Sequence, residues 1–199
     1  MNLVCLDMEG VLTPEIWIAL SEKTKIGALR RTTRDEPDYD KLMKDRIRIL
    51  KEHGLKLKDI QDVISGIDLL PGAADFMDRL RRRTQVIVLS DTFEEFAMPL
   101  MEKLRYPTIF CNSLVVNGEN EIVDYKMRIR NSKLATVKAL QSVGFETIAS
   151  GDSFNDLGMI EASKAGFLFR TTPAIRESHP EVPAFETYDE LYEEIEKVL

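Results

Sequence analysis

The chain has 199 residues, 44% hydrophobic and 31% charged, a composition typical of a water-soluble globular protein with one core and a modest insertion. The net charge of -7 argues against a nucleic-acid-binding surface. Cys5 and Cys111 lie in apolar runs and predict neither a disulfide nor a metal site. Since no apolar run approaches ~18 residues and no secretory leader is evident, we expect a cytoplasmic protein without membrane partners.

The chain begins with a short apolar run, residues 3–6, which predicts a buried strand. Asp7, Glu9 and Gly10 follow it. Side chains two residues apart in extended chain point to the same side, so the two carboxylates would converge at the carboxyl end of the strand. Open α/β sheets bind ligands at that edge. An ordinary polar turn is the alternative interpretation.

Residues 13–72 carry a helical pattern that is too long for a crossover between neighbouring strands. Thr13 and Pro14 suit the start of a helix, with Thr13 as its cap. Further helices are predicted over 40–52 and 58–65, with a charged loop over 30–40. We therefore expect a helical cap domain over 13–72, inserted into a core domain formed by 1–12 and 73–199.

From residue 73 onward, helical and strand patterns alternate. Helices are predicted over 73–83, 94–105, 132–143, 153–163 and 187–199. Strands are predicted over 86–89, 108–111, 147–149 and 166–169, with a hairpin over 113–125. This alternation predicts an α/β fold with a mostly parallel sheet and helices on both faces.

Polar side chains follow three of these strands. Besides Asp7 and Glu9, they are Ser90, Asp91, Asp152, Asn155 and Asp156. If the strands are parallel and adjacent, these groups meet at one edge of the sheet. A cluster of oxygen ligands favours Mg²⁺, with Asp7 and Asp152 as its natural carboxylates.

Lys133 lies in the first turn of the helix predicted over 132–143, where the helix dipole favours acids. A residue that breaks a local rule is a candidate for function, and this lysine would balance an anionic substrate. A lysine that extends into water is the alternative. A nucleophilic carboxylate, a second acid, a hydroxyl, a lysine and Mg²⁺ together suit phosphoryl transfer.

These motifs resemble those of the haloacid dehalogenase superfamily of phosphotransferases. The first motif, D-x-D-G-[TV], is matched by residues 7–11, Asp-Met-Glu-Gly-Val. The second is matched by Ser90, the third by Lys133, and the fourth, G-D-x-x-x-D, by residues 151–156. The resemblance implies a Rossmann-like three-layer core whose helical insertion is a cap.

The resemblance also implies roles for single residues. Asp7 would be the nucleophile and Glu9 the acid/base, and Mg²⁺ would be held by Asp7, the backbone carbonyl of Glu9, and Asp152. The phosphoryl group and substrate would contact Ser90, Asp91, Lys133 and Asn155, and Asp156 would support the metal site or its waters.

Two departures from the common pattern narrow the resemblance. Glu9 replaces the usual second Asp, and the S-G-G of phosphoserine phosphatases is here Ser-Asp-Thr over 90–92. These features resemble the bifunctional phosphoserine phosphatase/homoserine phosphotransferase subfamily, as do residues 14–17, 32–35, 37–40 and 42–43. The resemblance implies hydrolysis of phosphoserine and transfer of its phosphoryl group to homoserine.

Phosphoserine carries an ammonium and a carboxylate, and the family pattern assigns Glu15 and Arg46 to these groups. Arg46 also lies four residues from Leu42 and from Leu50, on the apolar face of its helix, where a guanidinium needs a partner. An internal ion pair or a snorkelling side chain is the alternative for Arg46. For Glu15, the alternative is an ordinary acid in a first helical turn.

The sequence thus predicts a Mg²⁺-dependent enzyme with phosphoserine and homoserine as small-molecule substrates. Other interpretations are a phosphatase for another small phosphorylated metabolite, a phosphorylatable receiver-type module and a non-catalytic interaction protein. The sequence does not decide between water and homoserine as acceptor, nor between a monomer and a homodimer.

Overall fold

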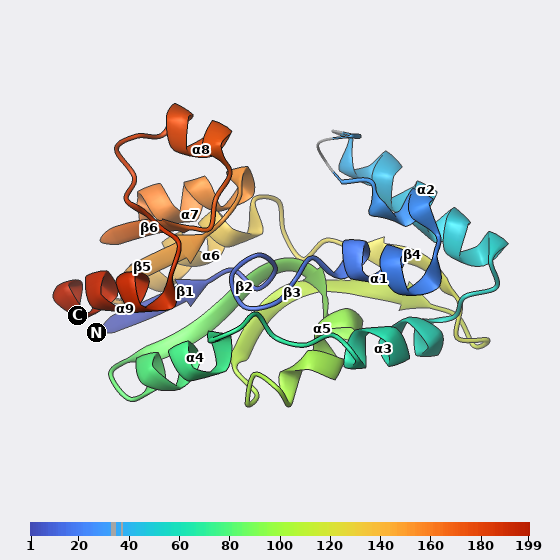
Figure 1. The fold of residues 1–199 in the computed structure, drawn as a ribbon, viewed down its shortest axis with the longest axis horizontal. Helices are drawn as coiled ribbons and strands as arrows, with labels where there is room; N and C mark the ends of the chain where they lie inside the picture. Colours follow the sequence, from blue (N-terminus) through green and yellow to red (C-terminus); the bar gives the residue numbers. More distant parts are fainter. Residues whose placement is uncertain (33–34, 37) are drawn as a thin grey trace.

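The computed structural model describes residues 1–32, 35, 36 and 38–199. Thr33, Arg34 and Pro37 belong to the loop predicted over 30–40 and to the segments that carry the subfamily resemblance, and they lie outside the described residues. Within the described ranges, one sheet contains seven strands in the order β4-β3-β2-β1-β5-β6-β7 (Figure 1). Neighbouring strands are parallel except for the antiparallel β3–β4 hairpin, as the sequence predicted.

The bounds of the elements follow the predicted alternation closely. The strands are β1 (Asn2–Leu6), β2 (Gln85–Phe93), β3 (Thr108–Val116), β4 (Ile122–Lys126), β5 (Glu146–Gly151), β6 (Ala165–Phe169) and β7 (Ala184–Phe185). The α-helices are α1 (Ile16–Thr24), α2 (Tyr39–Glu52), α3 (Leu57–Ser65), α4 (Ala73–Arg81), α5 (Glu94–Met101), α6 (Ser132–Ser142), α7 (Leu157–Ala162), α8 (Pro173–Ser178) and α9 (Tyr188–Val198). Two 3₁₀ turns are η1 (Gly27–Arg30) and η2 (Phe154–Asp156). In the part of the chain that the structure describes, no helix has the length and hydropathy needed to cross a membrane.

The two faces of the sheet carry separate apolar cores. Along β1, Leu3 and Cys5 pack into the cluster that includes residues of α6 and α7, whereas Val4 and Leu6 pack into the cluster that includes residues of α4, α5 and α9. This alternation follows from the two-residue period of a strand. The result is the predicted three-layer core, with helices on both faces of a mainly parallel sheet.

The inserted helices gather beyond the carboxyl ends of the central strands (Figure 1). Helix α3 packs on α5, and α2 packs on β4. Trp17 of α1 meets Phe96 of α5 edge-to-face, with 5.4 Å between ring centroids. The apolar side chains of the insertion therefore continue the core cluster of the α4 face. The division into a cap over 13–72 and a core over 1–12 and 73–199 stays a prediction.

The start of the first inserted helix differs from the prediction. Thr13 does not cap it and Pro14 does not begin it, because α1 starts at Ile16 after Glu15 in extended conformation. The backbone N–H of Thr13 donates to the carbonyl of Met8, which folds the preceding residues into a tight loop. That loop uses the residues that would otherwise form the first helical turn.

Other elements also differ from the prediction. The strand predicted over 86–89 continues through Phe93, so Ser90 and Asp91 lie within β2, where the register with β3 shifts between Leu89 and Phe93. The helix predicted over 94–105 ends at Met101. Helix α8, of six residues, and strand β7, of two residues, were not predicted, since neither is long enough to show a clear periodic pattern.

Tyr188 at the start of α9 joins the last helix to both chain segments that lead to and from the insertion. Its ring packs between Phe76 and Phe169, with centroid distances of 4.9 and 4.7 Å. Its hydroxyl donates to the carbonyl of Val11 at 2.6 Å, and a side chain at Gly72 would lie 3.0 Å from the ring. Tyr188 therefore contacts both segments that connect the insertion to the sheet.

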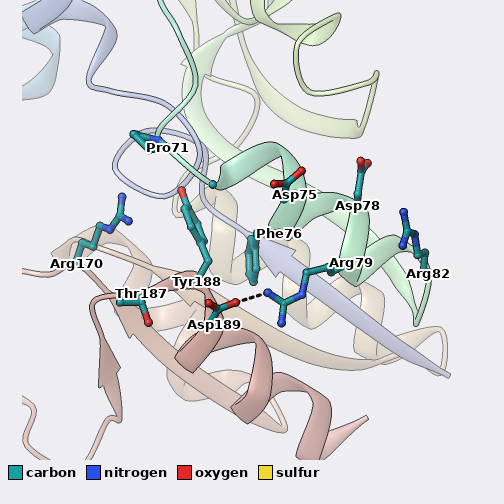
Figure 2. A pocket seen from close by; sticks show the side chains of 11 residues that line it. Pro71, Asp75, Phe76, Asp78, Arg79, Arg82, Arg170, Thr187, Tyr188 and Asp189 are labelled. Carbon is teal, nitrogen blue, oxygen red and sulfur yellow. Dashed lines mark hydrogen bonds and ion pairs between the residues drawn. The ribbon is translucent and has the colours of Figure 1, made fainter.

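A groove of about 610 Å³ opens beside Tyr188, between α4 and α9 (Figure 2). Arg79 and Asp189 form an ion pair across it, and the guanidinium of Arg79 also covers the ring of Tyr192. None of the predicted site residues lines this groove.

Replacing Tyr188 by Phe should lower the free energy of unfolding by about 1–2 kcal/mol, because the buried carbonyl of Val11 loses its donor. Urea denaturation measures this. The control is Tyr192→Phe, which removes a hydroxyl bonded to exposed Glu196 and should have little effect. Equal stabilities of the two variants would contradict the role of the Tyr188 hydroxyl.

Candidate active site

The carboxyl ends of β1, β2 and β5 bring the predicted motifs together around one buried cation. The ammonium of Lys133 lies 2.9 Å from Oδ1 of Asp7 and 2.6 Å from Oδ1 of Asp156. The three side chains are 7% exposed or less. Lys133 is therefore held between two acids, and the alternative of a lysine extending into water is wrong.

Asp7 lies where β1 ends and the loop begins, and its backbone N–H donates to the backbone carbonyl of Ser150 in β5. Its Oδ1 accepts from Lys133 and from the backbone N–H of Met8, the latter at 2.7 Å. Burial, then the nearby carboxylate of Asp156, raise the pKa of Asp7 well above its ordinary value, although Lys133 lowers it. Lys133 alone therefore does not compensate for the burial of Asp7 beside a second carboxylate.

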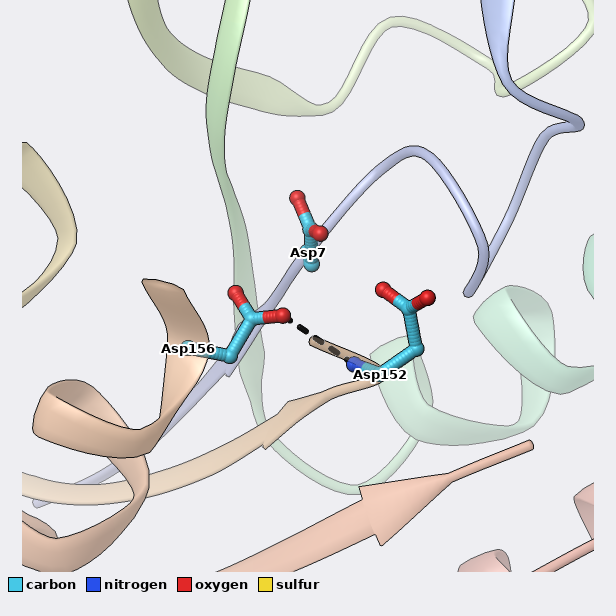
Figure 3. A group of neighbouring side chains, drawn as sticks. All are labelled: Asp7, Asp152 and Asp156. Atoms are coloured by element: carbon cyan, nitrogen blue, oxygen red, sulfur yellow. Dashed lines mark hydrogen bonds between the residues drawn. The ribbon is translucent and has the colours of Figure 1, made fainter. Parts of the chain in front are cut away.

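Asp152 completes a group of three carboxylates. Asp7, Asp152 and Asp156 each offer an oxygen, and these oxygens lie within 4.8 Å of one another (Figure 3). Burial, then Asp156, raise the pKa of Asp152 to about 7. Oδ2 of Asp156 accepts from the backbone N–H groups of Asp152 and Ser153, which fixes the geometry of the group. A divalent cation would relieve the repulsion among these acids.

Two glycines allow the acids to approach the backbone this closely. Gly10 has φ +79°, and a Cβ there would lie 2.5 Å from the carboxylate of Asp152. A Cβ at Gly151 would lie 2.2 Å from Cγ of Asp156. The motif glycines are thus required by contact with motif carboxylates.

Glu9 reaches from the first motif to the insertion. Its Oε2 accepts from the backbone N–H of Ile16 at 2.8 Å, so its carboxylate occupies the N-terminus of α1. Burial, then the nearby carboxylate of Glu15, raise the pKa of Glu9 to about 8, despite the lowering hydrogen bond from Ile16. A carboxyl group with this pKa carries a proton at neutral pH and can act as an acid.

Ser90 and Asp91 follow each other on β2 and face different neighbours. Ser90 is buried, and its Oγ accepts from the backbone N–H of Thr92 at 3.3 Å. The carboxylate of Asp91 accepts from the hydroxyl of Ser132 and from the amide of Asn155, each at 2.8 Å. That Ser90, Asp91 and Asn155 bind substrate stays a prediction.

Arg46 is 6% exposed on the inner face of α2, as its spacing indicated. Its guanidinium lies 4.3 Å over the ring of Trp17, and Nη2 donates to the carbonyl of Arg31 at 2.7 Å. Its Nε has no hydrogen-bond partner, and no carboxylate of the described residues lies within ion-pair distance. The alternative of an internal ion pair is therefore wrong for the described residues.

Burial lowers the pKa of Arg46 to about 10, and the charges of Glu9 and Glu15 act against this lowering. Glu15 is exposed just before α1, and its charge also raises the pKa of Asp152. Arg46 and Glu15 of the insertion therefore lie close enough to the core acids to interact with them electrostatically.

The sequence did not predict two residues whose hydroxyls bond to the acidic segment of the site. The hydroxyl of Thr171, after β6, donates to the carbonyl of Asp152 at 2.7 Å. The hydroxyl of Ser153 donates to Oδ2 of Asp156 at 3.0 Å. The Ser153–Asp156 spacing is that of a capping box and could have indicated the second contact, whereas no local signal marks Thr171.

Comparison with known proteins agrees with this geometry. The model of the haloacid dehalogenase-like hydrolase family matches residues 1–164. The chain belongs to this family. It is 50% identical to the phosphoserine phosphatase ThrH of Pseudomonas aeruginosa over 197 residues, which cover 99% of this chain and 96% of that protein. It is also 50% identical to a phosphoserine phosphatase of Pseudomonas syringae pv. tomato, covering 98% of this chain and 83% of that one.

Solved structures share the fold at lower sequence identity. A substrate-bound phosphoserine phosphatase complex matches with a TM-score of 0.77 and 19% identity, covering 100% of this chain and 98% of that chain. An apo phosphoserine phosphatase matches with a TM-score of 0.76 and 20% identity, covering 94% of both chains. These matches confirm the predicted three-layer α/β core with its inserted helices.

Without divalent cations, Asp152→Asn should melt about 5 °C higher than the wild type at about pH 8, and the difference should shrink towards pH 5. The pKa of Asp152 is raised from 3.8 to about 7 in the folded protein. The folded state therefore holds the proton of Asp152 more tightly than the unfolded state. This contribution to the free energy of unfolding is fully present below pH 3.8 and is lost as the pH rises through about 7. Thermal melts across this range measure the effect.

Added Mg²⁺ should raise the melting temperature of the wild type at about pH 8 and not that of Asp152→Asn. The control is Asp68→Asn, whose carboxylate is 96% exposed and should not alter either response. A wild-type response to Mg²⁺ that Asp152→Asn retains would contradict a cation at this carboxylate.

Proposed function

We propose that the protein is a Mg²⁺-dependent phosphoserine phosphatase that works through an aspartyl-phosphate at Asp7 and can pass the phosphoryl group to homoserine. The observation that carries this proposal is the contact of Lys133 with Asp7 and Asp156, which joins three of the four motifs at one edge of the sheet. The two Pseudomonas relatives named as phosphoserine phosphatases support the substrate.

The acids fit a magnesium ion. Three carboxylates within 4.8 Å of one another, with the pKa values of Asp7 and Asp152 raised, form an oxygen-rich anionic site. The ion would be held by the carboxylates of Asp7 and Asp152 and by the backbone carbonyl of Glu9. Asp156 would support this site. When bound, Mg²⁺ would neutralise charge on the phosphoryl oxygens.

Asp7 is the nucleophile in this proposal. Its Oδ1 is engaged by Met8 and Lys133, whereas Oδ2 accepts no hydrogen bond from the described residues and is available for attack. Attack forms an O–P bond to Asp7 and breaks the bond between phosphorus and the serine oxygen. Lys133 and Ser90 would bind the phosphoryl oxygens.

Glu9 would move the proton in both halves of the reaction. It holds a proton at neutral pH, which it gives to the departing serine oxygen. The resulting carboxylate then takes a proton from water or from the hydroxyl of homoserine. That oxygen attacks phosphorus and releases the Asp7 carboxylate.

Arg46 and Glu15 would recognise the amino-acid part of the substrate. Arg46 is a buried guanidinium without a carboxylate partner among the described residues, and a substrate carboxylate would satisfy it. Glu15, electrostatically close to Arg46, would face the ammonium. Homoserine carries the same two groups and one further methylene, so the pair would hold it where serine departs.

Incubation with phosphoserine and Mg²⁺, with and without homoserine, tests the function. Free phosphate should form without homoserine, and phosphohomoserine should form at its expense when homoserine is present.

Asp7→Asn should lower turnover about 1000-fold or more and prevent phosphoenzyme trapping, because an amide is a poor nucleophile. A long-lived phosphoenzyme without turnover would favour a receiver-type module, and full activity of Asp7→Asn would refute the scheme.

Arg46→Ala should raise KM for phosphoserine roughly 10–100-fold and that for p-nitrophenyl phosphate by less than about threefold, because only phosphoserine has a carboxylate. Steady-state kinetics on both substrates measure this. Arg48→Ala is the matched control, since Arg48 lies on the exposed face of the same helix in ion pairs with Asp45 and Glu52. Equal losses on both substrates would rule out Arg46 as the carboxylate clamp.

A further inference from the structure

Asp91 joins three segments of the site through its own polar atoms. Oδ1 accepts from the hydroxyl of Ser132 and Oδ2 from the side-chain amide of Asn155, each at 2.8 Å. Its backbone carbonyl accepts from the amide of Asn112 at 2.9 Å. Ser132 begins α6, Asn155 lies in η2, and Asn112 belongs to β3. A single residue of β2 is therefore bonded to the elements that carry two further motifs.

The start of α6 lacks the usual local cap. Asn131 stands at the capping position with φ +49°, and its side chain makes no capping hydrogen bond. Asp91 of β2 reaches this helix start through a side-chain contact rather than through a bond to a backbone amide. Its carboxylate binds the first residue of α6, Ser132, and places negative charge at the positive end of the helix dipole.

This placement matters because the next residue in α6 is Lys133. A cation in the first turn of a helix is opposed by the dipole. Burial also acts to lower the pKa of Lys133, but the carboxylates of Asp156, Asp7 and Asp91 outweigh it and raise this pKa above its ordinary value. Asp91 therefore places a carboxylate near Lys133 without bonding to it.

The second bond holds the fourth motif. Asn155 bonds to Asp91 and immediately precedes Asp156, the other partner of Lys133. Lys133 and Asp156 therefore lie on two segments that Asp91 connects, α6 and η2. Because both carboxylate oxygens of Asp91 already accept from protein donors, and because an anion repels a phosphoryl group, these contacts do not favour Asp91 as a substrate ligand.

We propose that Asp91 is a positioning residue that fixes the start of α6 and η2, and thereby sets Lys133 and Asp156 relative to Asp7. It acts through Ser132 and Asn155 rather than through the substrate. The kinetic part of the proposal rests on the proposed function, whereas the structural part does not.

The test compares Asp91→Asn, Ser132→Ala and the double variant. Asparagine cannot accept from both Ser132 and Asn155 as a carboxylate does, so kcat for phosphoserine should fall about tenfold while KM changes less than about twofold. Since Asp91 and Ser132 act through one bond, the double variant should lose less than the product of the two single losses. Glu146→Gln is the control, because it removes a carboxylate that is paired with Lys164 at the amino end of β5, far from the carboxyl ends that carry the site.

Hydrogen–deuterium exchange provides a readout that needs no substrate. Amides at the start of α6, over residues 132–136, should exchange about tenfold faster in Asp91→Asn and in Ser132→Ala than in the wild type or Glu146→Gln. If wild-type protein does not hydrolyse phosphoserine, the proposed function has failed, and exchange still decides whether Asp91 holds α6.

Three results would overturn the proposal. They are a rise in KM at unchanged kcat in Asp91→Asn, unchanged kcat despite faster exchange, and unchanged exchange over 132–136. If Asp91→Asn does not fold, Ser132→Ala alone carries the test, with lowered kcat and faster exchange expected.

Discussion

The ion pairs of Lys133 with Asp7 and Asp156 are the constraint on which the rest of the site depends. A buried ammonium is tolerated only where acids surround it, and buried acids this close are tolerated only around a cation. The parallel order β2-β1-β5 brings these groups to one edge. One lysine does not neutralise three carboxylates, and this excess of negative charge is what makes the site suitable for a hard divalent cation.

The sequence was sufficient to predict the core of this arrangement because it depends on simple rules. A polar residue after a buried strand lies at the ligand-binding edge of an open sheet, which brought together Asp7 and Asp152. Helical periodicity assigned Arg46 to the inner face of α2, where it lies. Lys133 was conspicuous because it opposed the dipole of its own helix.

What the sequence did not reveal are contacts between residues that no local rule connects. Tyr188 bonds to Val11 across 177 residues of sequence, and nothing in either segment indicates it. The two side-chain partners of Asp91 come from separate later segments, so the family resemblance implied a substrate contact while these neighbours suggest another role. Such contacts depend on the packed sheet, not on spacing.

Glu9 connects the two parts of the proposed mechanism. Its carboxylate, which belongs to the first motif, accepts a hydrogen bond from the first backbone N–H of α1. That helix also carries Trp17, on whose ring the guanidinium of Arg46 lies. The group proposed to transfer protons is therefore held by the same helix that supports the group proposed to recognise the substrate. The positions of the Glu9 carboxylate and of the Arg46 guanidinium therefore both depend on α1.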